Sequence, residues 1–518
     1  MSVLSDPRRS LSGWRGVLAM PLAGALASLA MPPTGLWPVL LVAVPALALS
    51  LQAAPGLRRA FLLGWLFGFG FHLAGLYWIG NAFLVDAARF AIFRPFAVSL
   101  LPAGLALFCG LAALLARWAA SDRLLLLSLP LAWSFCEWLR HWLLTGFPWN
   151  EMGFAFAGQA ALLQGAAWIG VQGLTLIVMS IAVLPAALVW FDTRGRLIAA
   201  IGGVAFLALL YAAGAARLAA APPIERDQGD LRLRLVQASI PQAQKWQRDR
   251  RDAHVANYLD LISAPALFPP DIVILPETAT PFLLDRDERR RRQLALAMPA
   301  GATLISGAPR FIPQGEGRAL RNAVHVIDAG GGILATYDKH HLVPFGEFLP
   351  LRGLLSKIGL EKLAAGKIDY SSGPGPTLID LPGLPAFQPL VCYEVIFPGE
   401  VGMDGEARWL LNLTNDAWFG DTAGPRQHLA AARMRAVEQG LPMVRAANTG
   451  ISAVFDSWGR ERGRLEVDER GILDLRLPDP LPQRTLYGRF GLALPAGIWV
   501  LALIGLLVLA RRARGPSY

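Results

Sequence analysis

The thiol of Cys392 is the side chain in this sequence that is best placed to do chemistry. Cys392 directly follows the apolar run 389–391, which is typical of a buried strand, and a polar and aromatic corner comes next. The chain has three cysteines, and Cys109 and Cys136 lie in long apolar segments where a thiol packs as a small hydrophobic group. A lone thiol at a strand end is either a buried structural group or a nucleophile, and its neighbours decide between the two.

Three charged residues follow apolar strands or stiff turns in the same region. Glu277 comes after the run 271–276, which ends in proline, and Lys339 enters a loop that ends in Glu347. Each alone is typical of a protein surface. Together with Cys392 they describe one chemistry, because a carboxylate can take the thiol proton and an ammonium can stabilise a tetrahedral oxyanion. The second carboxylate can hold the ammonium in place, so the set predicts attack of the thiol on a carbonyl.

The composition divides the chain into two parts. Of its 518 residues 54% are hydrophobic and 17% charged, which is too apolar for a wholly soluble protein. The net charge of +10 is uneven, because residues 218–487 carry 31 Lys+Arg against 32 Asp+Glu and the remainder carries 17 against 6. The basic excess belongs to the apolar part, so no nucleic-acid partner is expected.

Long apolar stretches flank the polar region. We expect eight membrane spans, at 12–31, 36–54, 60–80, 95–118, 123–143, 161–191, 197–216 and about 490–510. With a cytoplasmic N-terminus, the inside segments carry twelve arginines and the outside segments five. This predicts a membrane domain over 1–217, an exported domain over 218–487, and a span with a cytoplasmic tail over 488–518. If the first stretch were instead a cleaved signal peptide, the arginine pattern of the later loops would be out of phase.

The exported region alternates strands and helices, which favours an α/β architecture with a layered sheet. We expect strands at 230–237, 271–275, 302–306, 323–328, 409–413 and 443–446, and helices at 246–263 and 428–439. Structural cysteines usually pair in an oxidising compartment. The single cysteine of this domain, Cys392, is therefore either inaccessible or used.

Several segments resemble known families. The segments 275–277 and 391–394 and the Lys339 loop are similar to the Glu, Cys and Lys motifs of the nitrilase superfamily, which forms an αββα sandwich. Four longer segments resemble the apolipoprotein N-acyltransferases: 337–347, 415–420, 424–428 and 445–452. That family has eight membrane helices around an exported nitrilase-like domain, so the resemblance covers nearly the whole chain.

The resemblance implies a role for each matching residue at the reaction centre. Glu277 would be the general base, Lys339 would stabilise the oxyanion, and Cys392 would carry the acyl group as a thioester. Glu347 would orient Lys339.

Four further positions match residues around that centre. Tyr393 and Glu394 would lie beside the nucleophile, and Trp246 would lie in a loop over the pocket. Asn322 would position polar groups of the substrate. No cofactor is implied, and no cluster has the sequence spacing of metal ligands.

The implied reaction transfers a fatty acyl chain from a membrane phospholipid to the N-terminal amine of the diacylglyceryl-cysteine of an apolipoprotein. It proceeds through the thioester and predicts ping-pong kinetics. Both substrates are held in the bilayer. We therefore expect a monomeric multi-pass protein of the bacterial inner membrane, with its catalytic domain on the periplasmic side and both termini in the cytoplasm.

Two other functions fit parts of the pattern. A membrane-anchored amidase or nitrilase would use the same three residues, but it would release the acyl group to water and would not need eight spans. A transporter or receptor would place ionisable residues within its spans. The spans hold few such residues beyond His72, Glu137 and Arg140.

A papain-like pair is a third alternative. Cys392 would then work with His340, His341 or His428. This arrangement would leave Glu277 and Lys339 unexplained.

Overall fold

The computed structural model describes residues 14–514 except 120–121, 225, 227–228, 316, 359–361, 364–367 and 403–404. The chain divides into two compact units. Unit 1 comprises Met1–Tyr77, Pro95–Ala220 and Leu486–Tyr518, and unit 2 comprises Trp78–Arg94 and Ala221–Thr485. Residues 78–94, which the sequence places in the membrane domain, therefore belong to unit 2.

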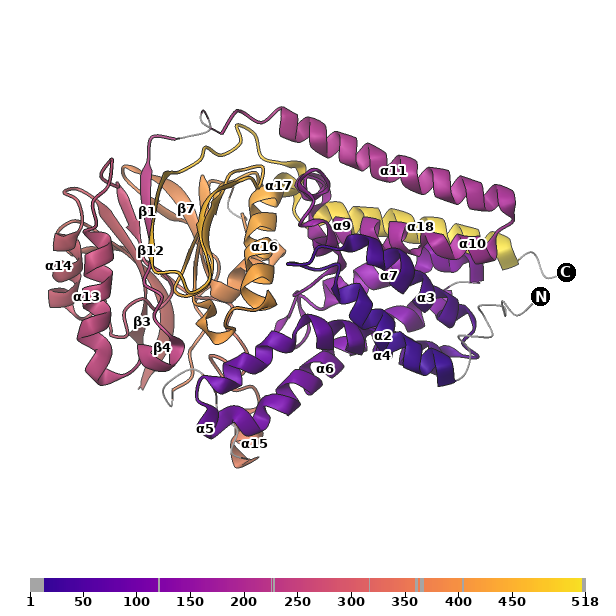
Figure 1. Cartoon of the computed structure of the whole chain (residues 1–518), viewed down its shortest axis with the longest axis horizontal. Helices are drawn as coiled ribbons and strands as arrows, with labels where there is room; N and C mark the ends of the chain where they lie inside the picture. Colours follow the sequence, from indigo (N-terminus) through magenta and orange to yellow (C-terminus); the bar gives the residue numbers. More distant parts are fainter. Residues whose placement is uncertain are drawn as a thin grey trace. The chain divides into compact units, whose positions relative to one another are not determined.

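Unit 1 is built from helices (Figure 1). Their bounds are α2 (Trp14–Ser28), α3 (Leu40–Gln52), α4 (Leu57–Gly75), α6 (Arg94–Ala119), α7 (Leu125–Leu139), α8 (Ala160–Leu163), α9 (Ala166–Val183), α10 (Ala187–Trp190), α11 (Thr193–Ala219), α17 (Leu486–Phe490) and α18 (Ala493–Arg514). Two glycines bring α2 against α4 with their backbones in contact. A Cβ at Gly24 would lie 1.9 Å from the carbonyl oxygen of Phe67, and a Cβ at Gly70 would lie 1.9 Å from that of Pro21. Small residues allow this close approach of apolar helices.

Fewer helices qualify as membrane spans than the sequence predicts. Helices occupy every predicted stretch, but among the described residues only four are long and apolar enough to cross a bilayer: Ala87–Ala119, Ala166–Trp190, Thr193–Ala219 and Ala493–Ala510. A fifth candidate is the pair Leu57–Gly75 and Tyr77–Leu84, which is bent by 49°. Two of the predicted stretches hold shorter apolar helices, Trp37–Gln52 and Leu125–Leu139. The run 123–143 is longer than α7 because it also includes the residues that flank this helix.

Unit 2 contains two six-stranded mixed sheets. Their strand orders are β12-β1-β2-β3-β4-β5 and β11-β10-β9-β8-β7-β6. The strands are β1 (Arg232–Gln237), β2 (Ile272–Ile274), β3 (Thr303–Gln314), β4 (Gly317–Ile327), β5 (Ile333–Asp338), β6 (Ile379–Leu381), β7 (Leu384–Val391), β8 (Trp409–Thr414), β9 (Met443–Ala447), β10 (Ser452–Phe455), β11 (Glu461–Leu465) and β12 (Gly471–Arg476). The helices are α5 (Ala87–Phe90), α12 (Gln242–Lys245), α13 (Arg251–Ile262), α14 (Glu288–Ala297), α15 (Arg352–Leu355) and α16 (Ala423–Gln439).

The two sheets face each other across one apolar core. Residues of the first sheet such as Leu235 and Ile274 share this core with Phe387, Trp409 and Leu413 of the second. A second apolar cluster joins α13 and α14 to the outer face of the first sheet, and α16 lies beside the second sheet (Figure 1). Unit 2 is thus an α/β sandwich whose layers run helix, sheet, sheet, helix, as the nitrilase resemblance predicts.

The element predictions for unit 2 are right in position but differ from the structure in extent. All six of the expected strands occur, as does the strand expected before Cys392, β7, while β5, β6, β10, β11 and β12 are additional. The helix expected from 246 begins only at Arg251, because α12 ends at Lys245. The helix expected from 428 begins at Ala423, where Thr422 caps it by accepting a hydrogen bond from Gly424 N at 3.2 Å. The pair Gly424-Pro425 is typical of a helix break, but proline is compatible with the first turn of a helix.

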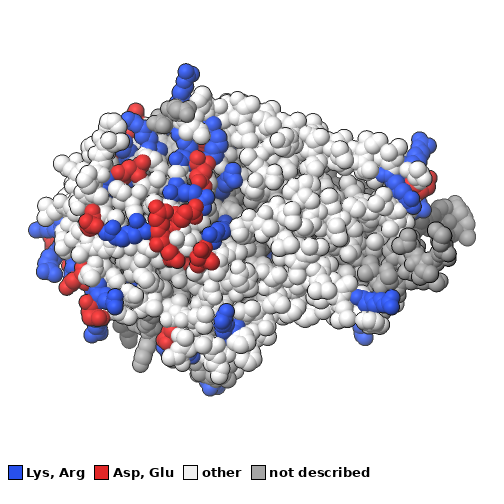
Figure 2. Space-filling view, viewed as in Figure 1, with Lys and Arg blue, Asp and Glu red and all other residues white. Residues whose placement is uncertain are grey.

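Charge separates the surfaces of the two units. In Figure 2 the Lys, Arg, Asp and Glu side chains gather over unit 2, and the body of unit 1 is uncharged on the face shown. Leucine and isoleucine side chains are exposed along α11 and α18, as for Ile201 at 60% and Leu501 at 71%. Such apolar exposure is expected for a surface that meets lipid.

One glycine in β3 controls where the end of β2 lies. A Cβ at Gly307 would come within 2.7 Å of Glu277 Cα and Pro276 O. We predict that Gly307→Ala displaces the segment that carries Glu277 and destabilises unit 2 by about 1–3 kcal/mol, as overpacking does. Thermal unfolding and the rate of Cys392 acylation measure the two effects. The matched control is Gly353→Ala, because space is open at that Cβ position. Equal behaviour of the two variants would contradict the prediction.

Candidate active site

Glu277, Lys339 and Cys392 follow the ends of three strands in unit 2. Glu277 comes three residues after β2, Lys339 directly follows β5, and Cys392 directly follows β7. Cys392 begins the 3-10 helix η10 (Cys392–Ile396) with a left-handed φ of 50°. β2 and β5 belong to the first sheet and β7 to the second, so the three residues come from both layers of the sandwich. Residues that follow the carboxyl ends of strands are where α/β folds commonly assemble sites.

Lys339 lies between two carboxylates. Its Nζ is 2.8 Å from Glu347 Oε2 and 3.7 Å from Glu277 Oε1, and the side chain is almost fully buried. Burial alone would lower the pKa of Lys339, but Glu347 and Glu277 together raise it above the ordinary value. The ammonium is therefore charged and fixed, as an oxyanion stabiliser must be.

Asn322 connects the same two carboxylates. Its Nδ2 donates to Glu277 Oε1 at 2.7 Å and to Glu347 Oε1 at 3.1 Å, and Val343 N donates to Glu347 Oε2 at 2.8 Å. The substrate contact expected for Asn322 stays a prediction, and the structure adds that its amide orients Glu277 and Glu347. Its side-chain oxygen is buried without a hydrogen-bond partner among the described residues, so it can still accept a bond from a substrate.

The thiol of Cys392 needs a base. Burial, followed by the negative charge of Glu277, raises the pKa of Cys392 well above its ordinary value, and Lys339 offsets this only in part. Burial also raises the pKa of Glu277. A raised carboxylate pKa makes Glu277 a stronger proton acceptor, which suits a general base for a thiol that is protonated at rest.

Glu394 ties the Lys339 loop to the turn that carries Cys392. One oxygen of its buried carboxylate accepts from Val391 N at 2.6 Å, and the other accepts from Tyr337 Oη at 2.8 Å and His340 N at 2.6 Å. These bonds hold the segment after Lys339 against the start of η10. Tyr393 is buried beside Phe397, with ring centroids 5.1 Å apart, so it packs within this turn.

Lys245 is a site residue that the sequence analysis missed. Its side chain is almost fully buried, and Nζ donates to the backbone oxygen of Glu277 at 3.2 Å. Burial lowers the pKa of Lys245 to about 8, against the opposing charges of Glu277 and Cys392. A lysine in a polar helix reads as solvated from sequence, and only the fold reveals its burial. Trp246 follows it and is half-buried.

A second buried network lies behind the nucleophile. His428 Nε2 is 3.0 Å from Cys392 O, and its Nδ1 is 2.9 Å from Asp416 Oδ1. Arg445 makes an ion pair with Asp416, and this charge and that of His428 lower the pKa of Asp416 to about 2 against the effect of burial.

The fold brings three potential metal ligands together that the sequence spacing does not indicate. One donor atom each of Cys392, Asp416 and His428 lie within 4.8 Å of one another. Asp416 is already bonded to Arg445, and the Arg445 guanidinium also lies 3.1 Å from His428 Nδ1. A fixed guanidinium among the donors opposes a cation, so these residues do not fit a metal centre.

The histidines do not form a papain-like base for Cys392. His340 Nδ1 is 3.3 Å from Gly373 O, and His341 Nδ1 is 3.2 Å from Glu400 Oε1. His428 faces the carbonyl oxygen of Cys392 with the nitrogen that would have to take the thiol proton.

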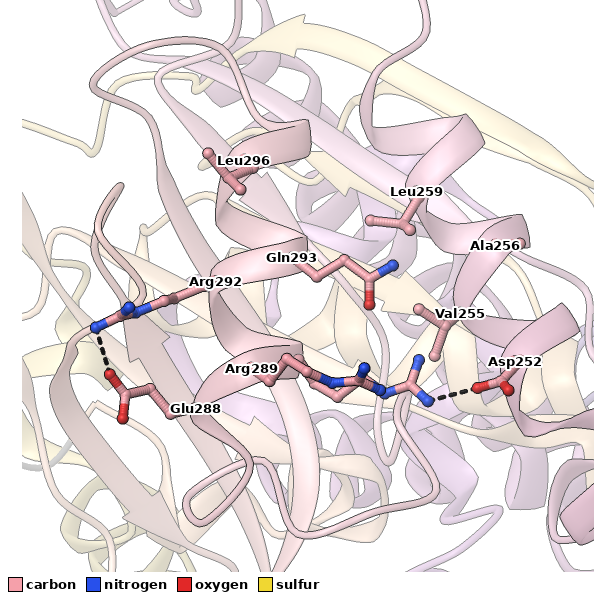
Figure 3. Close-up of a pocket in the computed structure, with 10 residues that line it drawn as sticks. Asp252, Val255, Ala256, Leu259, Glu288, Arg289, Arg292, Gln293 and Leu296 are labelled. Atoms are coloured by element: carbon pink, nitrogen blue, oxygen red, sulfur yellow. Dashed lines mark hydrogen bonds and ion pairs between the residues drawn. The ribbon is translucent and has the colours of Figure 1, made fainter.

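A surface pocket between α13 and α14 is separate from this site (Figure 3). Its lining includes the ion pairs Arg290–Asp252 and Arg292–Glu288, along with Leu259 and Leu296. None of the catalytic candidates is among its lining residues.

Comparisons with known proteins match both parts of the chain. The apolipoprotein N-acyltransferase N-terminal domain matches residues 23–184, and the carbon-nitrogen hydrolase domain matches residues 232–478. The apolipoprotein N-acyltransferase of Rhodopseudomonas palustris is 44% identical over 520 residues, covering 96% of each chain. That of Brucella melitensis is 40% identical over 523 residues, covering 98% of this chain and 96% of its own. The chain belongs to the apolipoprotein N-acyltransferase family.

A solved structure also aligns with part of the chain. An amidase from Nesterenkonia sp. covers 53% of this chain and 97% of its own, with 21% identity and a TM-score of 0.38. Within the N-acyltransferase family, the carbon-nitrogen hydrolase match and the observed sandwich identify unit 2 as a nitrilase-like α/β domain.

We predict that Glu347→Gln in this N-acyltransferase slows acylation of Cys392 by about 10²-fold, because Lys339 loses its closest carboxylate and with it a fixed position near the oxyanion. Mass spectrometry of the Cys392 peptide over time measures the rate. Glu288→Gln is the matched control, since Glu288 is 61% exposed on α14. An unchanged rate in Glu347→Gln would show that Lys339 does not depend on this contact.

The acylation rate of Cys392 should fall at low pH as Glu277 becomes protonated, and this fall is the acid limb of the pH profile. A carboxylate accepts a proton only when ionised, so with Glu277 as the predicted base we expect acylation to be lost as pH falls through its pKa, which burial raises above the ordinary value of about 4.3. Lys245→Met removes a positive charge that lowers this pKa, so we expect the limb to move to higher pH. Lys357→Met, on the exposed surface, is the control. The rate of Cys392 acylation between pH 4 and 8 is the measurement, and coincident limbs would refute the assignment.

Proposed function

We propose that this protein transfers a fatty acyl chain from a membrane phospholipid to the N-terminal amine of the diacylglyceryl-cysteine of an apolipoprotein. It is an N-acyltransferase of lipoprotein maturation. The observation that carries the proposal is the buried Lys339 ammonium held between the carboxylates of Glu277 and Glu347, in the same domain where Cys392 follows the end of β7. Family membership over nearly the whole chain supports the choice of substrates.

The first half-reaction forms a thioester. Glu277 takes the thiol proton as the Cys392 sulfur attacks the ester carbonyl of the phospholipid, and Lys339 stabilises the oxyanion. The carbon–oxygen bond then breaks, and the leaving lysophospholipid oxygen takes the proton from Glu277.

The second half-reaction forms the amide. The neutral α-amine of the apolipoprotein attacks the thioester, and Glu277 takes a proton from the nitrogen. The carbon–sulfur bond breaks and the thiolate takes that proton back, which restores the resting site. Covalent catalysis splits one difficult exchange into two easier steps.

Membrane attachment has a physical reason in this mechanism. A soluble pocket would have to extract acyl chains from the bilayer at about 0.8 kcal/mol per CH₂ group. Phe345, Leu351 and Leu354 expose 45%, 74% and 62% of their surface near the Lys339 loop. We propose that they enter the lipid interface beside the site.

The topology we propose has eight crossings, with unit 2 on the periplasmic side of the bacterial inner membrane and both termini in the cytoplasm. It is supported by a helix in every predicted apolar stretch and by the arginine distribution. We propose that the enzyme acts as a monomer, that Trp246 lies over the pocket, and that the domain boundaries fall near residues 217 and 487.

The test is to incubate the protein with labelled phospholipid and no acceptor. We expect a stable fatty acyl adduct on the Cys392 peptide by mass spectrometry, no adduct on Cys392→Ala, and a strongly reduced rate for Glu277→Gln. Steady release of free fatty acid without an adduct would indicate a membrane-anchored hydrolase and contradict the proposal.

A further inference from the structure

His428 contacts the nucleophile through its backbone. The ring lies on α16 at 1% exposure, and Nε2 is 3.0 Å from the carbonyl oxygen of Cys392. A carbonyl oxygen only accepts hydrogen bonds, so this contact assigns the proton to Nε2: in the neutral ring Nδ1 then accepts from Arg445, and in the charged ring Nδ1 donates to Asp416. Nδ1, on the other side, is held by Asp416 at 2.9 Å and Arg445 at 3.1 Å. The ring is therefore fixed from both sides.

The backbone of Cys392 requires such support. Its φ of 50° is left-handed, a conformation that costs a residue with a Cβ about 1–2 kcal/mol. The strain persists only where surrounding contacts determine it, and it is common at functional sites. His428 supplies one of those contacts, and Asn412 Nδ2 supplies a second, longer one at 3.4 Å from the same oxygen.

The contact sets the direction of a whole peptide group. A peptide bond is planar and trans, so fixing the carbonyl of Cys392 fixes the Tyr393 N–H in the opposite direction. The carbonyl and the Tyr393 N–H therefore cannot turn without breaking the bond from His428.

We propose that His428 is a positioning residue that holds the Cys392–Tyr393 peptide so that the sulfur and the Tyr393 N–H both face the reacting acyl carbonyl. Asp416 and Arg445 act through the ring. The inference rests on the proposed function, because it assigns His428 to the acyl transfer at Cys392. It gives His428 no part in proton transfer, which stays with Glu277.

Two amide substitutions separate the contact from the rest of the side chain. The amide nitrogen of Gln can reach the place of Nε2, whereas that of Asn reaches only the place of Nδ1. His428→Gln therefore keeps a donor for the Cys392 carbonyl and His428→Asn loses it. Both variants keep a polar side chain of similar size toward Asp416.

Two rates are measured on full-length wild-type and variant enzymes: acylation of Cys392 by labelled phospholipid, and alkylation of Cys392 by iodoacetamide. Alkylation needs the same thiol proton transfer but builds no oxyanion. In His428→Asn we expect acylation to fall by about 10²-fold, the usual loss when an oxyanion donor is misplaced, with alkylation nearly unchanged. In His428→Gln most of the acylation rate should remain.

Three results would overturn the inference: equal acylation in both variants, an unchanged rate in His428→Asn, or a parallel fall of alkylation, which would make His428 a base. A wild-type enzyme that is alkylated but never acylated would instead refute the proposed function.

A second measurement uses unmodified protein, so that folding of the variants does not matter. In ¹⁵N-histidine NMR we expect His428 Nε2 to be protonated across neutral pH, and an unprotonated Nε2 would also overturn the inference.

Discussion

The site depends on keeping one buried ammonium charged. Lys339 is removed from water, and an isolated charge there would cost several kcal/mol or lose its proton. Two carboxylates, joined by the amide of Asn322, hold the ammonium at 2.8 Å and 3.7 Å. Since two carboxylates outnumber one lysine, the group needs a further cation, and Lys245 supplies it from behind Glu277. The same burial that makes this group costly raises the basicity of Glu277 and keeps the thiol protonated until substrate arrives.

The sandwich positions Glu277, Lys339 and Cys392 because each of them follows the end of a strand. Glu277 and Cys392 follow strands of different sheets, and Lys339 follows β5 at the border of the first sheet. Glu394 then joins the Lys339 loop to the nucleophile turn, so a shift of one would carry the other with it. In this way the apolar core between the sheets determines distances among polar groups that lie far apart in sequence.

Residues 78–94 show how the apolar region contributes to unit 2. Trp78 Nε1 donates to Gln427 Oε1 at 3.0 Å, and Asn81 Nδ2 donates to Phe419 O at 2.9 Å. These contacts reach the start of α16 and the turn after β8, which carry His428 and Asp416. The segment thereby supports the network behind the nucleophile, although its composition resembles the neighbouring membrane helices.

The sequence singled out the residues proposed for the chemistry but not all of those that contact them in the fold. Glu277, Lys339 and Cys392 stood out because each follows an apolar strand or a stiff turn, and Glu347 because it ends the Lys339 loop. Lys245 escaped notice because a lysine's burial depends on what packs over it. The contacts of Asn322 with two carboxylates could not be foreseen because they join segments distant in sequence. The number of membrane spans stays a prediction, because helices occupy all eight predicted stretches while four of the described helices qualify by length and composition. The carbonyl contact of His428 involves a backbone atom, which no side-chain pattern encodes.

The most direct test of the central claim is a single-turnover chase. Enzyme acylated on Cys392 is freed of phospholipid and mixed with a diacylglyceryl-cysteine peptide, either with a free α-amine or with that amine acetylated. The account predicts that the thioester disappears at the rate at which N-acyl peptide appears, and that the acetylated peptide leaves the thioester intact. Loss of the thioester to water at one rate with both peptides would contradict it.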